Sequence, residues 1–444
     1  MKCIQDEIPF EVPEGWEWAR LGTICSKITD GTHHSPENYP TGEYKYVTAK
    51  NIKYDGIILG DITYVTAEVH KEIFSRCNPE FGDILYIKDG ATSGIATINT
   101  LHEEFSMLSS VALLKPACGM NNWYMCYVMQ SPYFYNITRD DMKGVGITRI
   151  TLNMLVSRLI PVPPMLEQKQ ISIKCRELIS LSATIEHDKQ LIQNLLFKTK
   201  TKILDLAIRG KLVPQDPDDE PASVLLDHIR AEKEELIKQG KIKRDKKESV
   251  IFKGEDNSYY EKIGDKLFCI DADIPFELPK GWAFTRLKSA WSLISGRDLS
   301  PSEYNDESNG TPYITGASNF ENGQVNIIRW TCVPQVFTYK GDLLLTCKGT
   351  VGEIAINNFG KAHIARQIMA LRNIYNLNIE FLALCIEYSM VEIKHAAKGL
   401  IPGISRDDIL NLIIPIPPAN QQKEIVRYTK IYFEKLNVIS RILN

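Results

Sequence analysis

The pattern of apolar and polar positions divides the chain into two kinds of segment. Residues 9–160 and 275–414 contain short runs of β-branched and aromatic residues bounded by Gly, Asn, Asp and Pro, a pattern that predicts strands. Examples are residues 44–49, 84–88, 111–115, 327–330 and 342–347. Apolar residues recur three and four positions apart at 123–129 and 379–392, which predicts short helices. We therefore expect an α+β fold for both stretches.

After Pro164 the apolar residues repeat at close to every 3.5 positions as far as Leu206, and Gly210 indicates the end of a helix. This predicts a helix about 65 Å long, at about 1.5 Å per residue. A second, shorter stripe of the same kind follows Pro418. Because each stripe needs an apolar partner, we expect the two helices to pair as an antiparallel coiled coil; the alternative is that each packs on its own α+β segment. The residues expected in this pairing, or in contact with a partner chain, are Ile171, Leu178, Ile185, Ile192, Leu195, Ile425, Tyr432, Leu436 and Ile439.

The chain also repeats itself. Residues 8–22 read IPFEVPEGWEWARLG and residues 274–288 read IPFELPKGWAFTRLK, while IPVPPMLEQKQI from Ile160 is matched by IPIPPANQQKEI from Ile414. The period is far longer than the roughly 20 to 50 residues of a solenoid unit, so it marks two copies of a domain-sized module. Between these anchors the copies differ. A shared frame with different contents is typical of two binding modules that read different targets, because binding residues lie mostly on loops held by a rigid frame.

These patterns predict five segments along the chain. They are a first module at 1–163, a first spacer helix at 164–210, a connector with a charged helix and a linker at 211–272, a second module at 273–417, and a second, short spacer helix at 418–444. Within the connector, residues 222–240 form the charged helix, and we interpret the mixed-charge run KIKRDKKE that follows as solvated and mobile, with phosphate contact as the alternative.

Composition narrows the class of protein. The chain has 444 residues, enough for about three folded units at about 150 residues each, and 44% hydrophobic content is ordinary for such units. No segment approaches the roughly 20 apolar residues of a membrane helix, and the N-terminus lacks the apolar core of a secretory signal. Ten scattered cysteines without a Cys-x-x-Cys pair favour reduced thiols, no metal site and a cytoplasmic location. A net charge of −3 does not favour nucleic-acid binding, but the clustering of basic residues matters more than their sum.

Two variable modules, each introduced by IPFE-P-GW and followed by a helix that opens with PP--EQ or PP--QQ, resemble the DNA-specificity subunit of type I restriction-modification enzymes. The segment GKLVPQDPDDEPASVLL is similar to the central conserved region of that family. The resemblance spans essentially the whole chain, although the final helix is short for the family pattern.

The resemblance implies that both modules are target recognition domains and that the helices are a spacer between them. It also implies partners: double-stranded DNA, two methyltransferase subunits and restriction subunits with translocase and nuclease activity. S-adenosylmethionine, ATP and Mg²⁺ are then expected in those partners and no cofactor in this chain. Side chains that reach base edges in the major groove read DNA sequence. Two different readers on one spacer predict a split, non-palindromic target whose adenines the partners methylate.

Candidate DNA-binding residues fall into two groups. Polar residues that recur in both copies are candidates for phosphate contacts; these are Lys88 with Lys348, Lys143 with Lys398, and Thr148-Arg149 with Ser405-Arg406. The alternative for the Arg pair is that it holds each module against its helix through buried hydrogen bonds. Polar residues that differ between the copies are candidates for base contacts, with ordinary surface loops as the alternative. They are Thr32, His33, His34, Tyr44, Lys50, Thr92 and Ser93 in the first copy and Arg297, Ser318, Asn319, Thr350 and Gln367 in the second.

Other motifs are better explained without chemistry. Trp16 and Trp282 belong to the repeated frame, so core packing is favoured over stacking on a base. The double prolines follow Val162 and Ile416, where an amino-methyltransferase motif would have Asn or Asp. Fragments of a nuclease motif, Pro217-Asp218 and Asp245-Lys246-Lys247, lie in the connector, and the segment Gly349–Gly352 is too short for a phosphate loop. The chain is predicted to be non-catalytic. Two alternatives remain, the recognition half of a single-polypeptide modification enzyme and a duplicated protein-binding scaffold.

Overall fold

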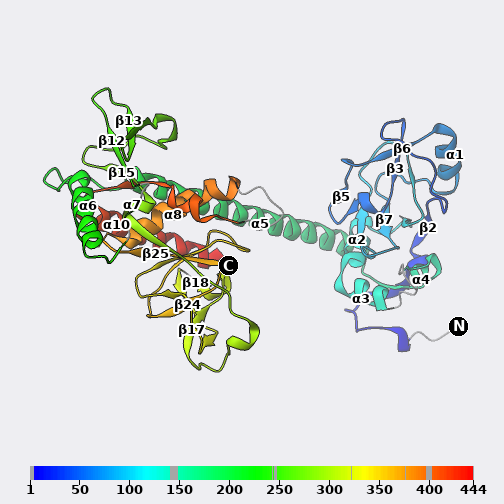
Figure 1. Cartoon of the computed structure of the whole chain (residues 1–444). Coiled ribbons are helices and arrows are strands. Elements are labelled where there is room, and N and C mark those ends of the chain that lie inside the picture. Colours follow the sequence, from blue (N-terminus) through cyan, green and yellow to red (C-terminus); the bar gives the residue numbers. More distant parts are fainter. Residues whose placement is uncertain are drawn as a thin grey trace. The chain divides into compact units, whose positions relative to one another are not determined.

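The computed structural model describes residues 5–140, 149–242, 244, 248–321, 323–375, 377–396 and 403–443, with the side chains of 391–396 left out. The chain forms two compact units, Met1–His187 and Asp188–Asn444 (Figure 1). Helix α5 (Met165–Ile208) contributes its first half to one unit and its second half to the other.

The first unit holds the first module. Its central sheet is antiparallel in the order β2-β10-β7-β8, and a smaller sheet has the order β6-β3-β9 with β3 and β9 parallel. Its strands are β1 (Glu17–Arg20), β2 (Cys25–Asp30), β3 (Tyr44–Val47), β4 (Ile52–Lys53), β5 (Gly56–Ile57), β6 (Thr63–Val65), β7 (Ile84–Ile87), β8 (Ala96–Ile98), β9 (Phe105–Met107), β10 (Val111–Pro116) and β11 (Leu159–Val162). Its helices besides α5 are η1 (Gln5–Glu7), η2 (Leu21–Thr23), η3 (Ala49–Asn51), α1 (Ala67–Arg76), α2 (Asn122–Gln130), α3 (Pro132–Asp140) and α4 (Leu152–Val156).

The central sheet of the first module is buried on both faces. All four residues of β7 are buried, so its side chains need cover above and below. Tyr86 packs with Met125 of α2 and Phe134 of α3, whereas Leu85 and Ile87 pack with the core of the smaller sheet. Helices therefore cover one face and the second sheet covers the other, which confirms the predicted α+β module.

The second unit repeats this arrangement. Its central sheet has the order β16-β25-β22-β23 and its smaller sheet the order β20-β17-β24-β21, with β17 and β24 parallel. Its strands are β12 (Ser249–Lys253), β13 (Tyr259–Ile263), β14 (Lys266–Cys269), β15 (Ala283–Arg286), β16 (Trp291–Ser295), β17 (Thr311–Ile314), β18 (Phe320–Glu321), β19 (Gln324–Val325), β20 (Trp330–Thr331), β21 (Phe337–Thr338), β22 (Leu343–Thr346), β23 (Ile354–Ile356), β24 (Ala362–Ile364), β25 (Ile368–Asn373) and β26 (Ile413–Ile416). Its helices are α6 (Ala222–Lys238), η4 (Asp271–Asp273), α7 (Leu287–Ala290), η5 (Pro301–Glu303), η6 (Ala317–Asn319), α8 (Ile379–Ala396), α9 (Arg406–Leu410) and α10 (Ala419–Leu443).

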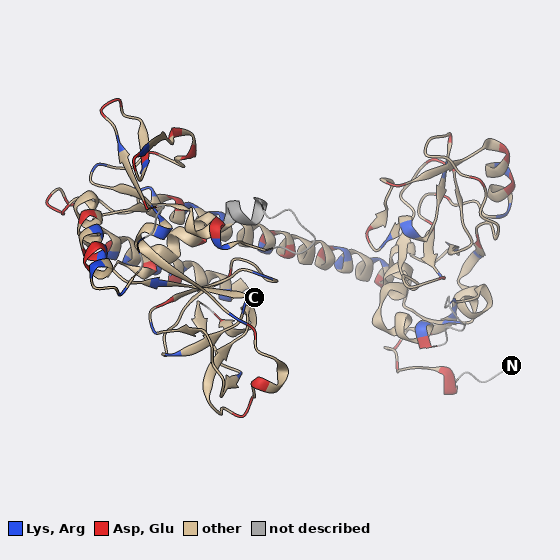
Figure 2. Cartoon of the chain, in the orientation of Figure 1, with Lys and Arg blue, Asp and Glu red and all other residues tan. Residues whose placement is uncertain are grey.

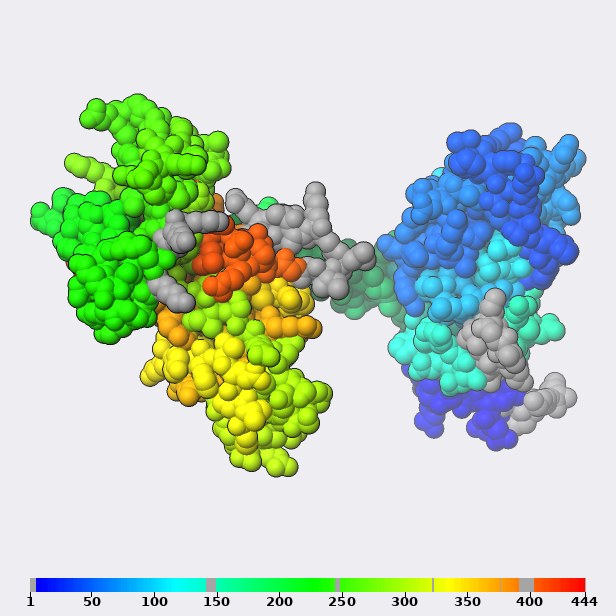
Figure 3. All heavy atoms as spheres, viewed as in Figure 1, coloured from blue at the N-terminus to red at the C-terminus, as the bar shows by residue number. Residues whose placement is uncertain are grey.

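The connector contains more structure than its sequence suggested. Helix α6 lies where the charged helix was expected, but residues 249–269, assigned to a linker, form the three-stranded sheet β12-β13-β14. Ile251 belongs to the core of the second unit, and the Arg286 guanidinium donates to both carboxylate oxygens of Glu261, at 2.7 and 3.1 Å. Figure 3 shows α6 and this sheet, in green, continuous with the yellow surface of the second module. Residues 243 and 245–247 of the mixed-charge run lie outside the described residues.

Helices α5 and α10 meet within the second unit. Lys200 Nζ donates to Asn437 Oδ1 at 2.7 Å and lies 5.9 Å from the Phe433 ring centre. The last turn of α5 shares a core with Ile425 near the start of α10, so the two helices run antiparallel, as predicted. Upstream of this contact the α5 stripe is open: Leu178, Ile185, Ile192 and Leu195 are exposed, and so are Tyr432 and Ile439 of α10. Ile425 itself is fully buried in the second module, while Ile171 and Leu436 are half-buried.

Each module is closed by the same set of contacts, which we call the clamp. The first and last strands pair as β1 with β11 and as β15 with β26. In the second module Gln422 Nε2 donates to Pro417 O at 2.9 Å and its Oε1 accepts from Asn378 N at 3.2 Å. Trp282 Nε1 donates to Gln421 Oε1 at 2.9 Å. The clamp joins the opening segment, the first turn of the spacer helix and the start of α8.

The first module has the same clamp. Gln168 Nε2 donates to Pro163 O and its Oε1 accepts from Asn121 N, both at 2.8 Å. Trp16 Nε1 donates to Glu167 Oε2 at 3.1 Å. Trp282 is 8% exposed and Trp16 is half-buried, and both rings pack edge-on against an aromatic ring of the adjacent helix. This supports the predicted packing role of the repeated Trp residues and explains why the anchors recur in the sequence.

We predict that Gln422→Ala destabilises the second module by about 1–3 kcal/mol, because it leaves the buried Pro417 carbonyl and Asn378 N–H without partners. Native-state hydrogen exchange of the α8 and α10 amides measures the effect. Lys423→Ala, at the exposed neighbouring position, is the control and should exchange like the wild type. Equal protection in Gln422→Ala and wild type would show that the clamp does not hold the module together.

We also predict that the attachment of β13 depends on pH. Hydrogen bonds from Arg286 hold the pKa of Glu261 below its ordinary value of 4.5, so the ionised carboxylate stabilises the folded unit. This contribution is complete above pH 4.5 and is lost as the pH falls through the lowered folded-state pKa. Glu261→Gln should therefore speed exchange of the β13 amides at pH 7, and the difference from wild type should vanish in acid. Asp265→Asn in the exposed turn of the same hairpin is the control; a difference that persists in acid contradicts the prediction.

Candidate nucleic-acid interface

Loops gather at one end of each central sheet. In the second module the register places the end of β16, the start of β25 and the end of β22 side by side. The isolated bridge between Lys348 and Gly403 brings a further loop to the same end. Equivalent pairings and the bridge between Asp89 and Arg149 build this end in the first module. We call these segments the sheet-end loops; they are residues 31–34, 88–94, 108–110 and 149–151 in the first module and 296–298, 347–352, 365–367 and 403–406 in the second.

The sheet-end loops of the second module carry exposed cations. Arg297, Lys348 and Arg406 were predicted from the sequence, and Arg366 was not. Arg406 Nη1 donates to Ser295 Oγ at 3.1 Å, and Arg366 Nε lies 2.7 Å from Asp298 Oδ2. Thr350 and Gln367, two other predicted residues, are also exposed here. Guanidinium, ammonium, amide and hydroxyl groups at one sheet end make a surface that can donate to phosphates and to base edges.

In the first module the same end is built around a buried carboxylate. Asp30 is 2% exposed. Its carboxylate oxygens lie 3.2 Å from Lys88 Nζ and 3.4 Å from His33 Nε2, and they also pair with the Arg76 guanidinium. Because the Lys88 ammonium is itself buried and paired, its geometry favours a structural role over phosphate contact. Ser93 is buried and donates to Ile87 O at 3.3 Å.

The remaining predicted residues of the first module divide by exposure. Thr92, His33, His34, Lys50 and Arg149 are exposed. Thr32 is half-buried and its Oγ1 donates to His34 O at 3.0 Å. Tyr44 lies away from these loops, in the smaller sheet, where its ring stacks on His70 with 3.9 Å between centroids.

Backbone hydrogen bonds correct the sequence alignment of the two copies. Ile150 N donates to Lys88 O and Ile404 N to Cys347 O, both at 2.9 Å. Lys88 is therefore equivalent to Cys347, and Lys348 is equivalent to Asp89. Likewise the helix caps Thr151 and Ser405 are equivalent, each accepting at 3.2 Å from a backbone N–H of the following helix. Counted from Gly82 and Gly341, which begin the matching segments, Lys88 falls on Cys347, so the match of the two lysines was one position out of register.

The corrected register changes the interpretation of the matched pairs. Arg149 and Arg406 do not occupy the same frame position, because Arg149 corresponds to Gly403, and the Ser405 hydroxyl serves as a helix cap. Arg149 and Arg406 are exposed, so they do not hold the modules through buried bonds, as the alternative interpretation required. Lys143, Thr148 and Lys398 lie outside the described residues.

Asn319 is part of the frame. It is fully buried, its Oδ1 accepts from Thr315 N at 2.9 Å, and its Nδ2 donates to Asn326 O at 2.9 Å. Asn51 makes the corresponding bonds with Thr48 and Ile58 in the first module. Because both polar atoms of its side-chain amide are hydrogen-bonded within a buried turn, Asn319 is poorly placed to read bases. Its neighbour Ser318 is exposed.

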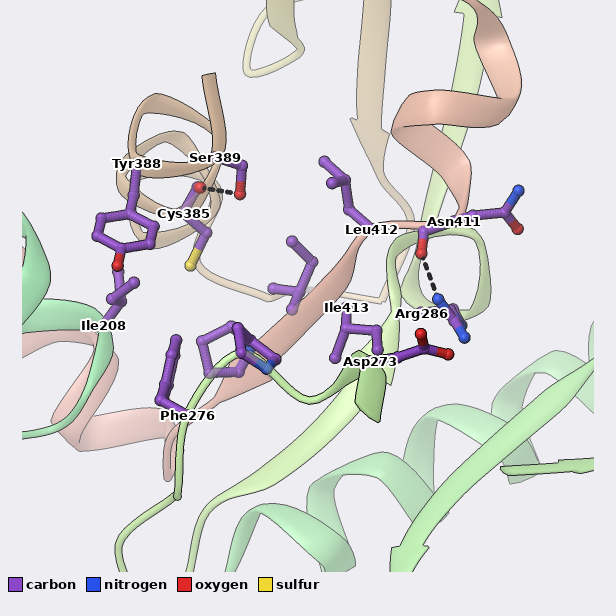
Figure 4. A pocket seen from close by; sticks show the side chains of 13 residues that line it. Ile208, Asp273, Phe276, Arg286, Cys385, Tyr388, Ser389, Asn411, Leu412 and Ile413 are labelled. Carbon is purple, nitrogen blue, oxygen red and sulfur yellow. Dashed lines mark hydrogen bonds between the residues drawn. The ribbon is translucent and has the colours of Figure 1, made fainter. Parts of the chain in front are cut away.

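A cavity of about 330 Å³ in the second unit contains no arrangement for catalysis. Figure 4 shows Ile208 of α5, Cys385 and Tyr388 of α8, and Asn411 around it. Burial raises the pKa of the Cys385 thiol, which therefore stays protonated and unreactive. Ser389 Oγ donates to Cys385 O at 2.9 Å within its own helix. The cavity is a gap in packing where the end of α5 meets the module.

Figure 2 shows Lys and Arg mixed with Asp and Glu along α5 and α6. Within the described ranges, no group of three or more His, Cys, Asp or Glu side chains is placed to bind a metal ion. Every helix in the same ranges is too short or too polar to cross a membrane.

Comparison with known proteins identifies the repeated unit. The family model described as the type I restriction modification DNA specificity domain matches residues 13–195 and 279–444. The specificity subunit of the type I restriction enzyme EcoAI from Escherichia coli is 28% identical, over 66% of this chain and 54% of that subunit. The chain thus spans about half the length of that relative. The EcoEI specificity subunit from the same species is 24% identical, over 98% of this chain and 80% of the subunit.

Solved structures show the same fold. A chain from a structural study of assembly and conformational transition in the type I R-M system has a TM-score of 0.63 at 19% identity, covering 98% of this chain and 94% of that chain. The HsdS subunit from Thermoanaerobacter tengcongensis has a TM-score of 0.52 at 20% identity, covering 99% and 94%. The matched domain is a DNA-recognition domain rather than a catalytic one. With two copies of that domain covering most of its length, the chain belongs to the family of type I restriction-modification DNA specificity domains.

Proposed function

We propose that this chain is the specificity subunit of a type I restriction-modification complex and recognises a split, non-palindromic DNA target. Bound there, it directs adenine methylation and ATP-dependent cleavage by its partner subunits. The observation that carries the proposal is one frame built twice, with different side chains on its sheet-end loops. Thr32, His33 and Ser109 in the first module occupy the places of Arg297, Asp298 and Arg366 in the second. Two different readers require two different tracts of sequence.

Helix α5 supplies the spacer in this proposal. Its 44 residues make a rod about 65 Å long at about 1.5 Å per residue. Base pairs opposite such a spacer are not read, so the two tracts are separated by a gap of fixed length. Half-sites on one face of DNA favour a separation near a helical turn, roughly 34 to 36 Å, or a multiple of it.

The partner subunits dock on the helices in this proposal. The exposed stripe of α5, with Leu178, Ile185 and Leu195, is more apolar than a solvated helix face needs to be. Because the two clamps are alike, they offer two similar sites, one for each of two methyltransferase subunits; restriction subunits join that assembly. S-adenosylmethionine, ATP and Mg²⁺ belong to these partners. The exposed stripe supports this contact with a partner chain.

The first prediction from this proposal concerns the independence of the modules. Replacing residues 23–159 with the corresponding segment of a relative leaves in place β1, its pairing with residues 160–162 of β11, and the Trp16–Glu167 contact. The chimera, assembled with its methyltransferase partner, should therefore fold and should methylate a target in which one tract has changed and the other is the same. Sequencing of methylated genomic DNA measures both tracts. A chimera in which both tracts change contradicts independent reading.

The second prediction concerns Lys348, which is exposed at the sheet end. Lys348→Ala should weaken binding of the methyltransferase complex to its target and to unrelated duplexes alike. Because one phosphate contact is lost, the slope of log K against log salt concentration should fall by about 0.9. Lys266→Ala, at an exposed position of β14 outside the sheet-end loops, is the control and should leave the slope unchanged. An unaltered slope in Lys348→Ala removes this residue from the interface.

A further inference from the structure

The turn that precedes β25 presents side chains of different chemistry in the two modules. Ile368 N donates to Ala365 O at 2.9 Å, which closes a β-turn with Arg366 and Gln367 at its tip. In the first module Val111 N donates to Leu108 O at 3.0 Å, and the tip residues are Ser109 and Ser110. The same turn thus carries two short hydroxyl side chains in one module and two long side chains with planar donor groups in the other.

A carboxylate fixes the direction of Arg366. Asp298 Oδ1 accepts from the Arg366 backbone N–H at 3.0 Å, and Asp298 Oδ2 lies 2.7 Å from Arg366 Nε. The hydrogen bond fixes the backbone of the turn, and the ion pair holds the guanidinium at its Nε edge. In the part of the chain that the structure describes, no hydrogen bond engages either Nη of Arg366, and the side chain is 66% exposed. The guanidinium is therefore held beside Asp298 at the surface, and its terminal nitrogens are left for a ligand.

This geometry selects a neutral acceptor pair over a phosphate. The major-groove edge of guanine presents N7 and O6, which match the two terminal nitrogens of a guanidinium. A phosphate at the same place would lie next to the Asp298 carboxylate and would be repelled by it. A neighbouring carboxylate would not help an Arg that contacts only phosphate. For an Arg that contacts one base edge, the same carboxylate fixes the orientation of the guanidinium.

We propose that Arg366, oriented by Asp298, reads a guanine in the DNA tract recognised by the second module. The inference rests on the proposed function and adds the base and the side chain that reads it. Asp298 is a positioning residue, because it acts through Arg366 and does not itself contact the DNA. Ser109 and Ser110 cannot make this bidentate contact, so the first module reads its tract without it.

The test uses the complex of the full chain with its methyltransferase partner and the target defined by sequencing of methylated DNA. The tract of the second module is the one that the exchange of residues 23–159 leaves unchanged. That tract should contain at least one G·C pair. In wild type, replacing this G·C pair by A·T should weaken binding by about 5- to 150-fold, which corresponds to about 1–3 kcal/mol.

In Arg366→Ala and Arg366→Lys this preference should be lost at one position only, with every other position of both tracts read as before. Asp298→Asn should lower the preference while leaving or raising overall affinity, because a negative charge near DNA is removed. The salt slope should be unchanged in Arg366→Ala, since no phosphate contact is lost. Arg244→Ala, at another exposed Arg paired with a carboxylate, should show wild-type preference throughout.

Three results overturn the inference while leaving the proposed function intact. They are a second tract without a G·C pair, full discrimination by Arg366→Ala at every position, and a salt slope that falls in Arg366→Ala by the amount expected for a phosphate contact. A wild-type complex without any sequence preference would overturn the proposed function itself, and the inference with it.

Discussion

Everything else in this molecule depends on the clamp that closes each module. The chain enters a module on one strand and leaves it on the strand paired beside it, as β1 with β11 and β15 with β26. At that point one buried Gln bonds the first turn of the spacer helix to the chain before it and to the start of the adjacent helix. Because buried polar groups must find partners, these bonds fix the direction in which the helix leaves. The rest of the module can then vary without moving its ends.

The two sheet ends show how far that variation goes. The first module keeps a carboxylate, Asp30, inside the sheet end and surrounds it with Lys88, Arg76 and His33. The second module has its carboxylate, Asp298, on the outside, where it orients Arg366. In the first module the Lys88 ammonium is buried against the carboxylate, and in the second the Arg366 guanidinium is held at the surface. A common frame can therefore present surfaces of different chemistry, as a protein that recognises two dissimilar tracts requires.

Much of the frame could be predicted from the sequence because the clamp uses residues that cannot easily be replaced. Trp16, Trp282 and the Pro-Pro steps recur for this reason and marked the two copies. The α+β modules, the long helix and the antiparallel direction of α10 were predicted from the spacing of apolar residues. The β12–β14 sheet was missed, although Val250, Ile251 and Phe252 precede a polar turn and Tyr259-Tyr260 follow it. The many charged residues at 241–248 obscured the alternation of apolar and polar residues that predicts a hairpin.

The candidate interface was less accessible to sequence reasoning. Lys88 and Lys348 look alike in the sequence, but the backbone hydrogen bonds make Lys348 equivalent to Asp89 and Lys88 equivalent to Cys347. Asn319 has a side chain suited to adenine, yet its bonds close a buried turn. Arg366 gave no signal because Asp298 lies 68 positions earlier in the chain, and only the fold brings the two together. Contacts between residues so far apart in the sequence form only in the folded chain, so no local sequence pattern predicts them.

The central claim is that one frame, used twice, reads two different pieces of one DNA site. The most direct measurement is sequencing of methylated DNA from cells that express the wild-type chain with its methyltransferase partner. The account predicts one methylated site made of two unlike tracts, separated by a gap of constant length whose bases are unconstrained. A single continuous site, or two tracts that are each other's reverse complement, would contradict it.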